Sequence, residues 1–447
     1  MDLDYGDAAE AFRSEVRGWL AANLPASPLP PMDTAEGAAA HREWERRLAD
    51  ARLSVVSWPA EYGGRGASLL EWLVFEEEYH AAGAPGRIGQ NGLFLLAPAL
   101  FEHGTPDQRA RLLPRIARAD DVWAQAWSEP GAGSDLAAIR CRADRTEGGW
   151  LLNGQKTWSS RAPVGDRAFG LFRTESSASG TSISTERSAS GTSISTERSA
   201  SGTSISTERS ASGTSISTER SASGTSISTE SSASGTSIST APTARRHHGL
   251  TYFLFDLHAP GVTVRPIAQL DGRAGFAELF LDDVFVPDAD VLGEVGAGWA
   301  VAMRTTSSER GLSLRSPGRF TAAADRLVGL WHEVGDAGDT ALADRVTDAW
   351  ITARAYQLRT LGTVTRLAEG GALGAESSID KLTWSELDLA LHETALDLLG
   401  PEAECRDTGG WADGWLFALA GPIYAGTNEI QRGVVAERLL GLPRGRR

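Results

Sequence analysis

The sequence contains very little cysteine and lysine. Its 447 residues include two cysteines, Cys141 and Cys405, and all but two of its 43 basic residues are arginine, the exceptions being Lys156 and Lys381. Two cysteines cannot form a disulfide framework, so we expect a protein of a reducing compartment.

The sequence also lacks positive net charge and long apolar runs. Its formal net charge is −15, whereas nucleic-acid-binding proteins normally carry a basic stripe. The longest strongly apolar run, Gly92–Phe101, is far shorter than the roughly 20 residues that span a bilayer. The beginning, MDLDYGDAAEAF, is acidic and lacks the pattern of a secretion signal. We therefore predict a cytoplasmic enzyme that neither binds nucleic acid nor inserts into a membrane.

Common nucleotide and metal motifs are missing. Gly293, Gly296 and Gly298 follow one another in the wrong order for a dinucleotide-binding loop, and no P-loop motif occurs. His247 and His248 are adjacent, and adjacent side chains on a strand point to opposite faces. The sequence therefore predicts no metal site.

A repeat occupies Ser177–Thr240, where SASGTSISTER recurs with an 11-residue period. Each unit offers one Ile and one Ala, too little apolar surface to offset the backbone entropy lost on ordering. We predict a disordered surface loop; the alternative is that TSIST segments pair as strands in a small β-solenoid. The flanking segments, AFGLFRTE and LTYFLFDL, are typical of strands. The repeat is thus predicted to expand a hairpin loop.

The rest of the chain divides into three regions. Residues 1–121 show helical apolar spacing, as at Phe12, Val16 and Leu20. Residues 122–294, with the insertion 177–240, contain short β-type runs separated by Gly, Pro and Asp. Residues 295–447 are again helical in pattern. We predict an α+β protein, mostly α, with helices, then antiparallel strands, then a helical bundle.

Four regions carry motifs that resemble one known family. They are WPAEYGGRG, then AWSEPGAGSDLAA with NGQKTWSS, then AELFLDDVFVPDADVLGEVGAGW, and finally IYAGTNEIQRGVVAERLLGL. Together and in this order they resemble the acyl-CoA dehydrogenase flavoprotein family. Within this family the sequence resembles the actinobacterial-type subgroup, in which the catalytic base lies on the first bundle helix.

The resemblance implies an N-terminal helical domain, a central antiparallel β-barrel and a C-terminal four-helix bundle, with FAD between barrel and bundle. It implies α,β-desaturation of an acyl-CoA or another acyl thioester, in which a carboxylate takes the α-proton while the β-hydride goes to flavin N5. An electron-transfer flavoprotein or a similar acceptor would then take the electrons. The expected assembly is a homodimer, homotetramer or heterotetramer.

The resemblance also assigns cofactor-binding positions in the β region. Trp158 matches a tryptophan near the flavin ring, and Ser160 a hydroxyl residue near N5. Gln125 and Ser128 match positions at the pyrimidine edge, and Ser134 lies in a segment near the CoA arm. The alternative for Ser128 and Ser134 is a structural role in turns, in which serine is common.

Positions in the last region complete the expected site. Thr427 and Glu429 match residues on the ribityl and adenosine side of FAD, and Thr427 is also a suitable helix N-cap. Many family members have a catalytic Glu in Y-E-G-T, where this chain has Ala425. Ala425 accepts no proton, but its backbone N–H is retained as a donor to the substrate carbonyl.

Glu309, directly before Arg310, matches the base position of the subgroup that carries its Glu on the first bundle helix. The preceding positions Trp299, Ala302, Met303 and Thr306 predict an apolar face with Glu309 at its inner edge. The alternative is a solvated helix residue, the usual place of a helical Glu.

Two further functions remain open at this stage. One is a non-catalytic or half-site subunit of a heteromeric acyl-CoA dehydrogenase, because Ala425 replaces the usual base and no R-x-x-F-G segment follows Pro317. The other is a related flavoenzyme that acts on a carrier-protein-bound substrate.

Overall fold

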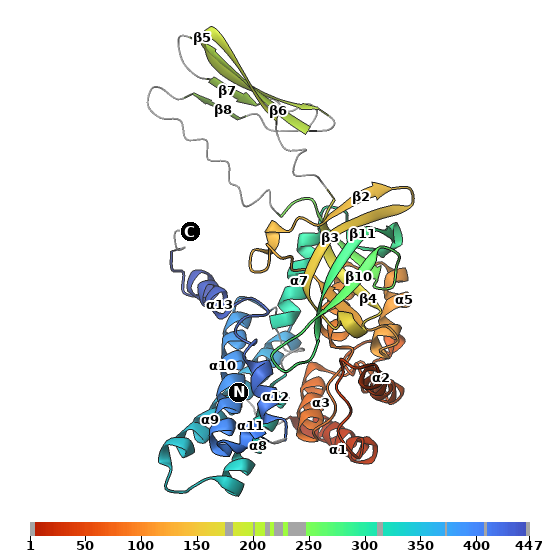
Figure 1. The fold of residues 1–447 in the computed structure, drawn as a ribbon, viewed down its shortest axis with the longest axis vertical. Helices are drawn as coiled ribbons and strands as arrows, with labels where there is room; N and C mark the ends of the chain where they lie inside the picture. The colour runs from red at the N-terminus through yellow and green to blue at the C-terminus, as the bar shows by residue number, and fades with distance from the viewer. Residues whose placement is uncertain are drawn as a thin grey trace.

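The structure is a computed structural model that describes residues 5–174, 182–199, 202–210, 215–218, 227–230, 247–310, 316–371, 373–405 and 409–443. Its order of elements, helices, then a sheet, then helices, is the predicted one (Figure 1). Within these residues, no helix has both the length and the hydropathy that crossing a bilayer requires.

The N-terminal helices begin with strong local signals. Ser68 caps α3 through a capping box with Glu71, and Thr105 caps α5 in the same way with Gln108. Gln108 then donates from Nε2 to the carbonyl of Val291 (2.7 Å), which joins these helices to the sheet. The elements are α1 Gly6–Asn23, α2 Ala35–Asp50, η1 Ala60–Tyr62, α3 Leu69–Ala81, the π-helix η2 Asn91–Leu96, α4 Ala97–His103 and α5 Pro106–Ala117.

A sheet with the strand order β10-β11-β3-β2-β4-β9-β12 follows, and β1 pairs with β4. Its strands are β1 Trp123–Ala126, β2 Arg142–Thr146, β3 Gly149–Ser160, β4 Arg167–Arg173, β9 Leu250–Asp256, β10 Val262–Ile267, β11 Phe276–Pro287 and β12 Val291–Leu292. Three short 3-10 helices join them: η3 Leu136–Ala138, η4 Ala162–Val164 and η5 Asp288–Asp290. The sheet is mixed rather than wholly antiparallel, because β1 runs parallel to β4.

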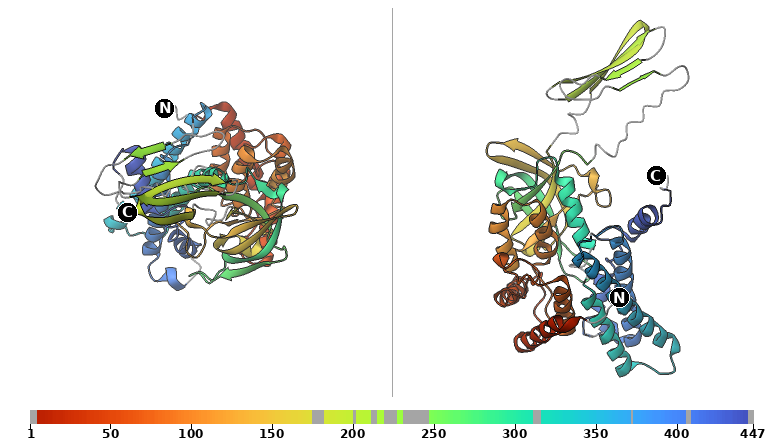
Figure 2. Two further views of the ribbon diagram at one scale, coloured as in Figure 1. Left: turned by 90° about the horizontal axis from the view of Figure 1, so that it is seen from above. Right: turned by 180° about the vertical axis from the view of Figure 1, so that it is seen from behind.

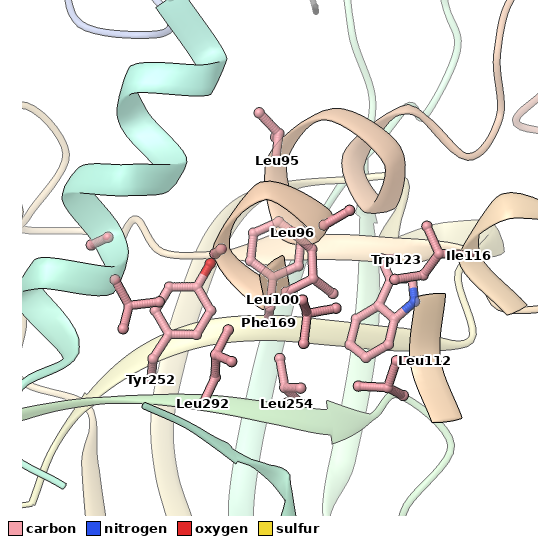
Figure 3. Close-up of a cluster of buried hydrophobic side chains, with 14 of the residues drawn as sticks. Leu95, Leu96, Leu100, Leu112, Ile116, Trp123, Phe169, Tyr252, Leu254 and Leu292 are labelled. Carbon is pink, nitrogen blue, oxygen red and sulfur yellow. The ribbon is translucent and has the colours of Figure 1, made fainter. Parts of the chain in front are cut away.

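Both faces of the sheet are buried. On one face, Phe169, Tyr252 and Leu254 pack against Leu100 of α4 and Ile116 of α5 (Figure 3). On the other face, a second core is formed by residues that include Trp150, Phe172, Phe253 and Leu279. Burial on both sides explains why β4 and β9 are almost continuously apolar instead of alternating.

The C-terminal part is a helical bundle in which α8, α9 and α10 pack together and α7 contacts α10, α4 and β9. The views of Figure 2 show α7 between the sheet and the bundle. The bundle core includes Phe320, Tyr356, Trp384 and Leu391. The elements are α7 Gly298–Arg310, α8 Pro317–Val334, α9 Thr340–Ala368, α10 Ser377–Leu399, α11 Glu402–Cys405, α12 Trp411–Ala418, α13 Asn428–Val434 and the π-helix η6 Val435–Leu439.

The repeat contains strands, in contrast to the predicted disordered loop. The elements β5 Ser182–Ser199, β6 Gly202–Ser210, β7 Ser215–Thr218 and β8 Ile227–Glu230 form a separate sheet in the order β6-β5-β7-β8. The physical reason is the identity of the units: β5 and β7 pair in parallel with like beside like, Ile194 opposite Ile216. Such in-register pairing of β-branched residues favours strands even where little apolar surface is available.

Candidate functional site

Trp158 stands near the end of β3 in an unusual backbone conformation. Its φ is +56°, in the left-handed region that non-glycine residues rarely adopt. The pairing of β3 with β11 shifts register opposite this residue, between Ala277 and Leu279. The side chain is 59% exposed and meets the ring of Phe276 edge to face, with 6.1 Å between centroids. A strained, exposed tryptophan at a bulge is the kind of feature that accompanies functional sites.

Ser160 is held by a residue that the sequence reading missed. The amide Nδ2 of Asn91 donates to Ser160 Oγ (3.0 Å) and to the Ser160 carbonyl (3.2 Å). Asn91 is buried and is the first residue of the π-helix η2, a type of irregularity that often marks function. The only sequence signal for it is a polar residue placed directly before the apolar run that begins at Gly92.

The segment that carries Ser128 is tied to β3. The backbone N–H of Thr157 donates to the carbonyl of Ser128 (2.9 Å), next to Trp158. Gln125 lies three residues earlier on β1, partly exposed and paired with Phe169. The structure therefore brings Gln125, Ser128, Trp158 and Ser160 to neighbouring ends of β1 and β3. Ser134 is exposed on the loop before η3, and no hydrogen bond of the described residues joins it to the other four.

A buried ion pair fixes this segment. Lys156 Nζ donates to Glu129 Oε1 (2.9 Å), and to the carbonyls of Trp127 (3.3 Å) and Leu171 (2.8 Å). The Glu129 carboxylate also accepts from the backbone N–H groups of Arg140 and Cys141. Burial on its own raises the pKa of Glu129, but the charge of Lys156 and these donors hold it below its usual value. The pair positions both neighbours of Ser128.

The last region presents a tight turn before α13. Ala425 and Gly426 have φ values of +57° and +82°, and Gln431 Nε2 donates to both of their carbonyls (3.1 and 3.3 Å). Thr427 caps α13 by accepting from the N–H of Ile430 (3.3 Å), as the sequence predicted. The backbone N–H of Ala425 makes no hydrogen bond within the described part of the chain.

Glu429 is exposed in the first turn of α13. Its pKa is lowered by its own backbone N–H and by the Thr427 hydroxyl. The second lysine stabilises this turn: Lys381 Nζ donates to Asn428 Oδ1 (2.6 Å) and to the Gly421 carbonyl (2.9 Å). Each of the two lysines therefore holds one loop of the candidate site.

Helix α7 carries Glu309, whose side chain lies outside the described part of the structure. Residues 301, 305 and 309 follow one another at four-residue spacing and so share one face of the helix. Val301 and Thr305 are buried, and Tyr252 of β9 is within hydrogen-bond distance of Thr305 Oγ1 (3.3 Å). Position 309 is thus on the face that packs toward the sheet. The predicted apolar face is rotated slightly, since Met303 is exposed and Val301 is buried.

An ion pair joins the sheet to α12 of the bundle. Arg273, on the loop between β10 and β11, donates from Nη2 to Asp413 Oδ2 of α12 (2.7 Å). No hydrogen bond or ring contact among the described residues joins the Trp158–Ser160 group directly to the Ala425–Glu429 turn. The first group lies on the sheet and the second in the bundle.

Comparisons with known proteins agree on one family. Sequence models match the acyl-CoA dehydrogenase N-terminal domain at residues 6–120, the middle domain at 124–216 and the C-terminal domain at 296–440. The chain is 35% identical to the acyl-CoA dehydrogenase IpdE1 of Mycobacterium tuberculosis, over 97% of this chain and 98% of that protein.

Solved structures share the fold. The Tcur3481-Tcur3483 steroid ACAD matches with a TM-score of 0.76 at 23% identity, covering 100% of both chains. A chain of the ChsE4-ChsE5 complex from Mycobacterium tuberculosis matches with a TM-score of 0.71 at 23% identity, again over 100% of both chains.

Proposed function

Because the chain belongs to the acyl-CoA dehydrogenase family and is thus an FAD-dependent oxidoreductase of acyl-CoA, we propose that it desaturates an acyl thioester between Cα and Cβ, with Glu309 as the base. The observation that carries the proposal is the left-handed turn at Ala425, whose N–H has no acceptor among the described residues. Within the chain we propose three domains, 1–121, 122–294 with the insertion 177–240, and 295–447.

The residues present fit a flavin. Trp158 offers an exposed ring face on a strained backbone, and Ser128 and Ser160 supply polar groups on neighbouring segments that are held by Lys156 and Asn91. Gln125 extends this polar edge. Thr427 and Glu429 would contact the cofactor from the bundle side, and Ser134 would contact the CoA arm of the substrate. When bound, FAD supplies the acceptor for the hydride that leaves Cβ.

The protein's own groups would act on the thioester from two sides. The Ala425 N–H donates to the carbonyl oxygen, where negative charge develops as the α-proton leaves; a donor of this kind contributes about 3–4 kcal/mol of transition-state stabilisation. The left-handed turn held by Gln431 keeps that N–H in place before substrate arrives. The carboxylate of Glu309 takes the α-proton, and packing of α7 against the sheet limits water at that helix face.

A half-site subunit is the second candidate, and Ala425 is the observation that favours it, because a residue with no proton acceptor occupies a common base position. Two proteins of similar fold, the Tcur3481-Tcur3483 steroid ACAD and the ChsE4-ChsE5 complex, are each named as a pair of different chains. We therefore propose an acyl-CoA or another acyl thioester as substrate, an electron-transfer flavoprotein or a similar acceptor as partner, and a homo- or heteromeric assembly.

An anaerobic flavin-reduction screen tests the function. The purified protein, loaded with FAD, is mixed with a panel of acyl-CoAs and acyl carrier proteins, and flavin absorbance is followed. We expect at least one acyl-CoA to bleach the flavin. If none does, and bleaching appears only after a sister subunit is added, the half-site function is correct instead.

Trp158→Ala should weaken FAD binding at least about 10-fold, because the variant loses a large aromatic contact. The measurement is the fluorescence quenching of FAD on titration with apoprotein. Trp350→Ala is the matched control, since Trp350 is an exposed tryptophan on α9 of the bundle. Equal affinity in both variants would remove Trp158 from the flavin site.

A further inference from the structure

Arg161 directly follows the candidate flavin residues, and within the described part of the chain its guanidinium makes no hydrogen bond or ion pair. It adopts a left-handed conformation (φ +68°), and its backbone N–H donates to the carbonyl of Gly275 (3.1 Å). The side chain is partly buried, and its Nε is buried without a hydrogen bond. No hydrogen bond or ion pair of the described residues involves this guanidinium.

The nearby acidic groups are already engaged. Asp33 and Glu45 are close enough to Arg161 to interact with it electrostatically, but neither forms an ion pair with it. Asp33 accepts from the N–H of Ala274 (3.0 Å), and Glu45 is paired with Arg87 (2.8 Å). Neither carboxylate lies within ion-pair distance of Arg161, although the charges of both act on it.

The polar groups of His41 and Asn91 are engaged with other partners. The two ring nitrogens of buried His41 contact the carbonyls of Gly86 (2.9 Å) and Pro30 (3.2 Å). Asn91 uses its amide Nδ2 as a donor toward Ser160. Burial lowers the pKa of Arg161, and the charges of Asp33 and Glu45 only partly oppose this effect. A guanidinium with a buried N–H and no close partner costs free energy, so its retention calls for a ligand that supplies an acceptor.

We propose that Arg161 binds an oxygen of the acyl group, a carboxylate or a carbonyl, at the part of the substrate remote from the thioester. This inference rests on the proposed function. The Ala425 N–H, the proposed hydrogen-bond donor to the thioester carbonyl, belongs to the bundle. Asp33, Glu45 and Asn91 place Arg161 on the side of the N-terminal helices. An acyl chain that passes Ser160 thus leads away from the thioester toward the guanidinium. The substrate class is an oxygen-bearing acyl thioester rather than a plain hydrocarbon chain.

The test compares three CoA thioesters of matched length, one ending in a carboxylate, one carrying a ketone and one purely hydrocarbon. For the protein as it is, we expect dissociation constants and kcat/KM to favour at least one oxygenated compound by about 10- to 100-fold, as hydrogen bonds to a charged group do. In Arg161→Met this preference should disappear, so that the ratio falls to about 1. Arg161→Lys should restore part of it, because it keeps the charge but not the planar fork. Arg142→Met, an exposed arginine of the same sheet, should leave the ratio unchanged.

Thermal unfolding separates binding from a structural role. Removing an uncompensated cation should leave the melting temperature of Arg161→Met unchanged or higher, whereas loss of a structural anchor would lower it. The proposal is overturned if the dissociation constants of all three thioesters stay equal before and after the substitution. Binding decides the question even without turnover, so the absence of bleaching by any thioester would overturn the proposed function alone.

Discussion

Replacing Glu309 with glutamine should lower the rate of flavin reduction by an acyl-CoA by about 10²- to 10⁴-fold, the usual contribution of a positioned general base. Glutamine keeps the size and hydrogen-bonding capacity of the side chain but accepts no proton. FAD content and melting temperature should remain those of the parent protein, because position 309 lies on α7 while the proposed flavin contacts lie on β1, β3 and α13. Stopped-flow absorbance under anaerobic conditions measures the effect.

Glu393→Gln is the matched control for this experiment. Glu393 is an exposed glutamate on bundle helix α10, so its substitution should leave the rate constant unchanged. Loss of rate in both variants would indicate a general effect of bundle charge. An unchanged rate in Glu309→Gln would exclude Glu309 as the base and leave the half-site function as the better explanation.

The order of helices, sheet and helices was predictable from local patterns. Helical spacing at Phe12, Val16 and Leu20 corresponds to the buried face of α1, and the cap predicted at Thr427 is present. Such features depend on residues within a few positions of one another, so a sequence reading captures them. The parallel pairing of β1 with β4 joins segments about 40 residues apart, and no local pattern encodes it.

Only part of the candidate site could be predicted from the sequence, because some of its contacts join residues that are distant in the chain. Motifs pointed to Trp158 and Ser160 individually, but the contact between Asn91 and Ser160 spans 69 positions of sequence. The left-handed backbone at Trp158 arises from a register shift against β11. The unsatisfied guanidinium of Arg161 becomes visible only when the contacts around it are known. In the repeat, amino-acid composition alone does not reveal how well identical units pair with one another.

Replacing Lys156 with methionine should destabilise the protein by about 3–5 kcal/mol, because it leaves the Glu129 carboxylate buried without its cation. Methionine fills a similar volume, so the loss is one of charge rather than of packing. The segment that carries Ser128 should loosen as well, and FAD affinity should fall. Denaturant unfolding and FAD titration measure the two effects. The double variant Lys156→Met with Glu129→Gln should recover most of the stability, since no buried charge then remains.

The loss of stability caused by Lys156→Met should decrease as the pH falls. In the parent protein the pKa of Glu129 is lowered, so the pair stabilises the fold above the unfolded pKa of about 4.3 and this contribution is lost as the pH falls through the folded value. Without Lys156, burial favours the protonated acid. The stability difference between Lys156→Met and the parent should therefore be largest near pH 7 and shrink toward pH 4. Arg142→Met, which breaks the exposed pair with Asp144, should change stability little at any pH. A difference for Lys156→Met that stays constant from pH 7 to pH 4 would mean that Lys156 acts through packing, and not through the charge of Glu129.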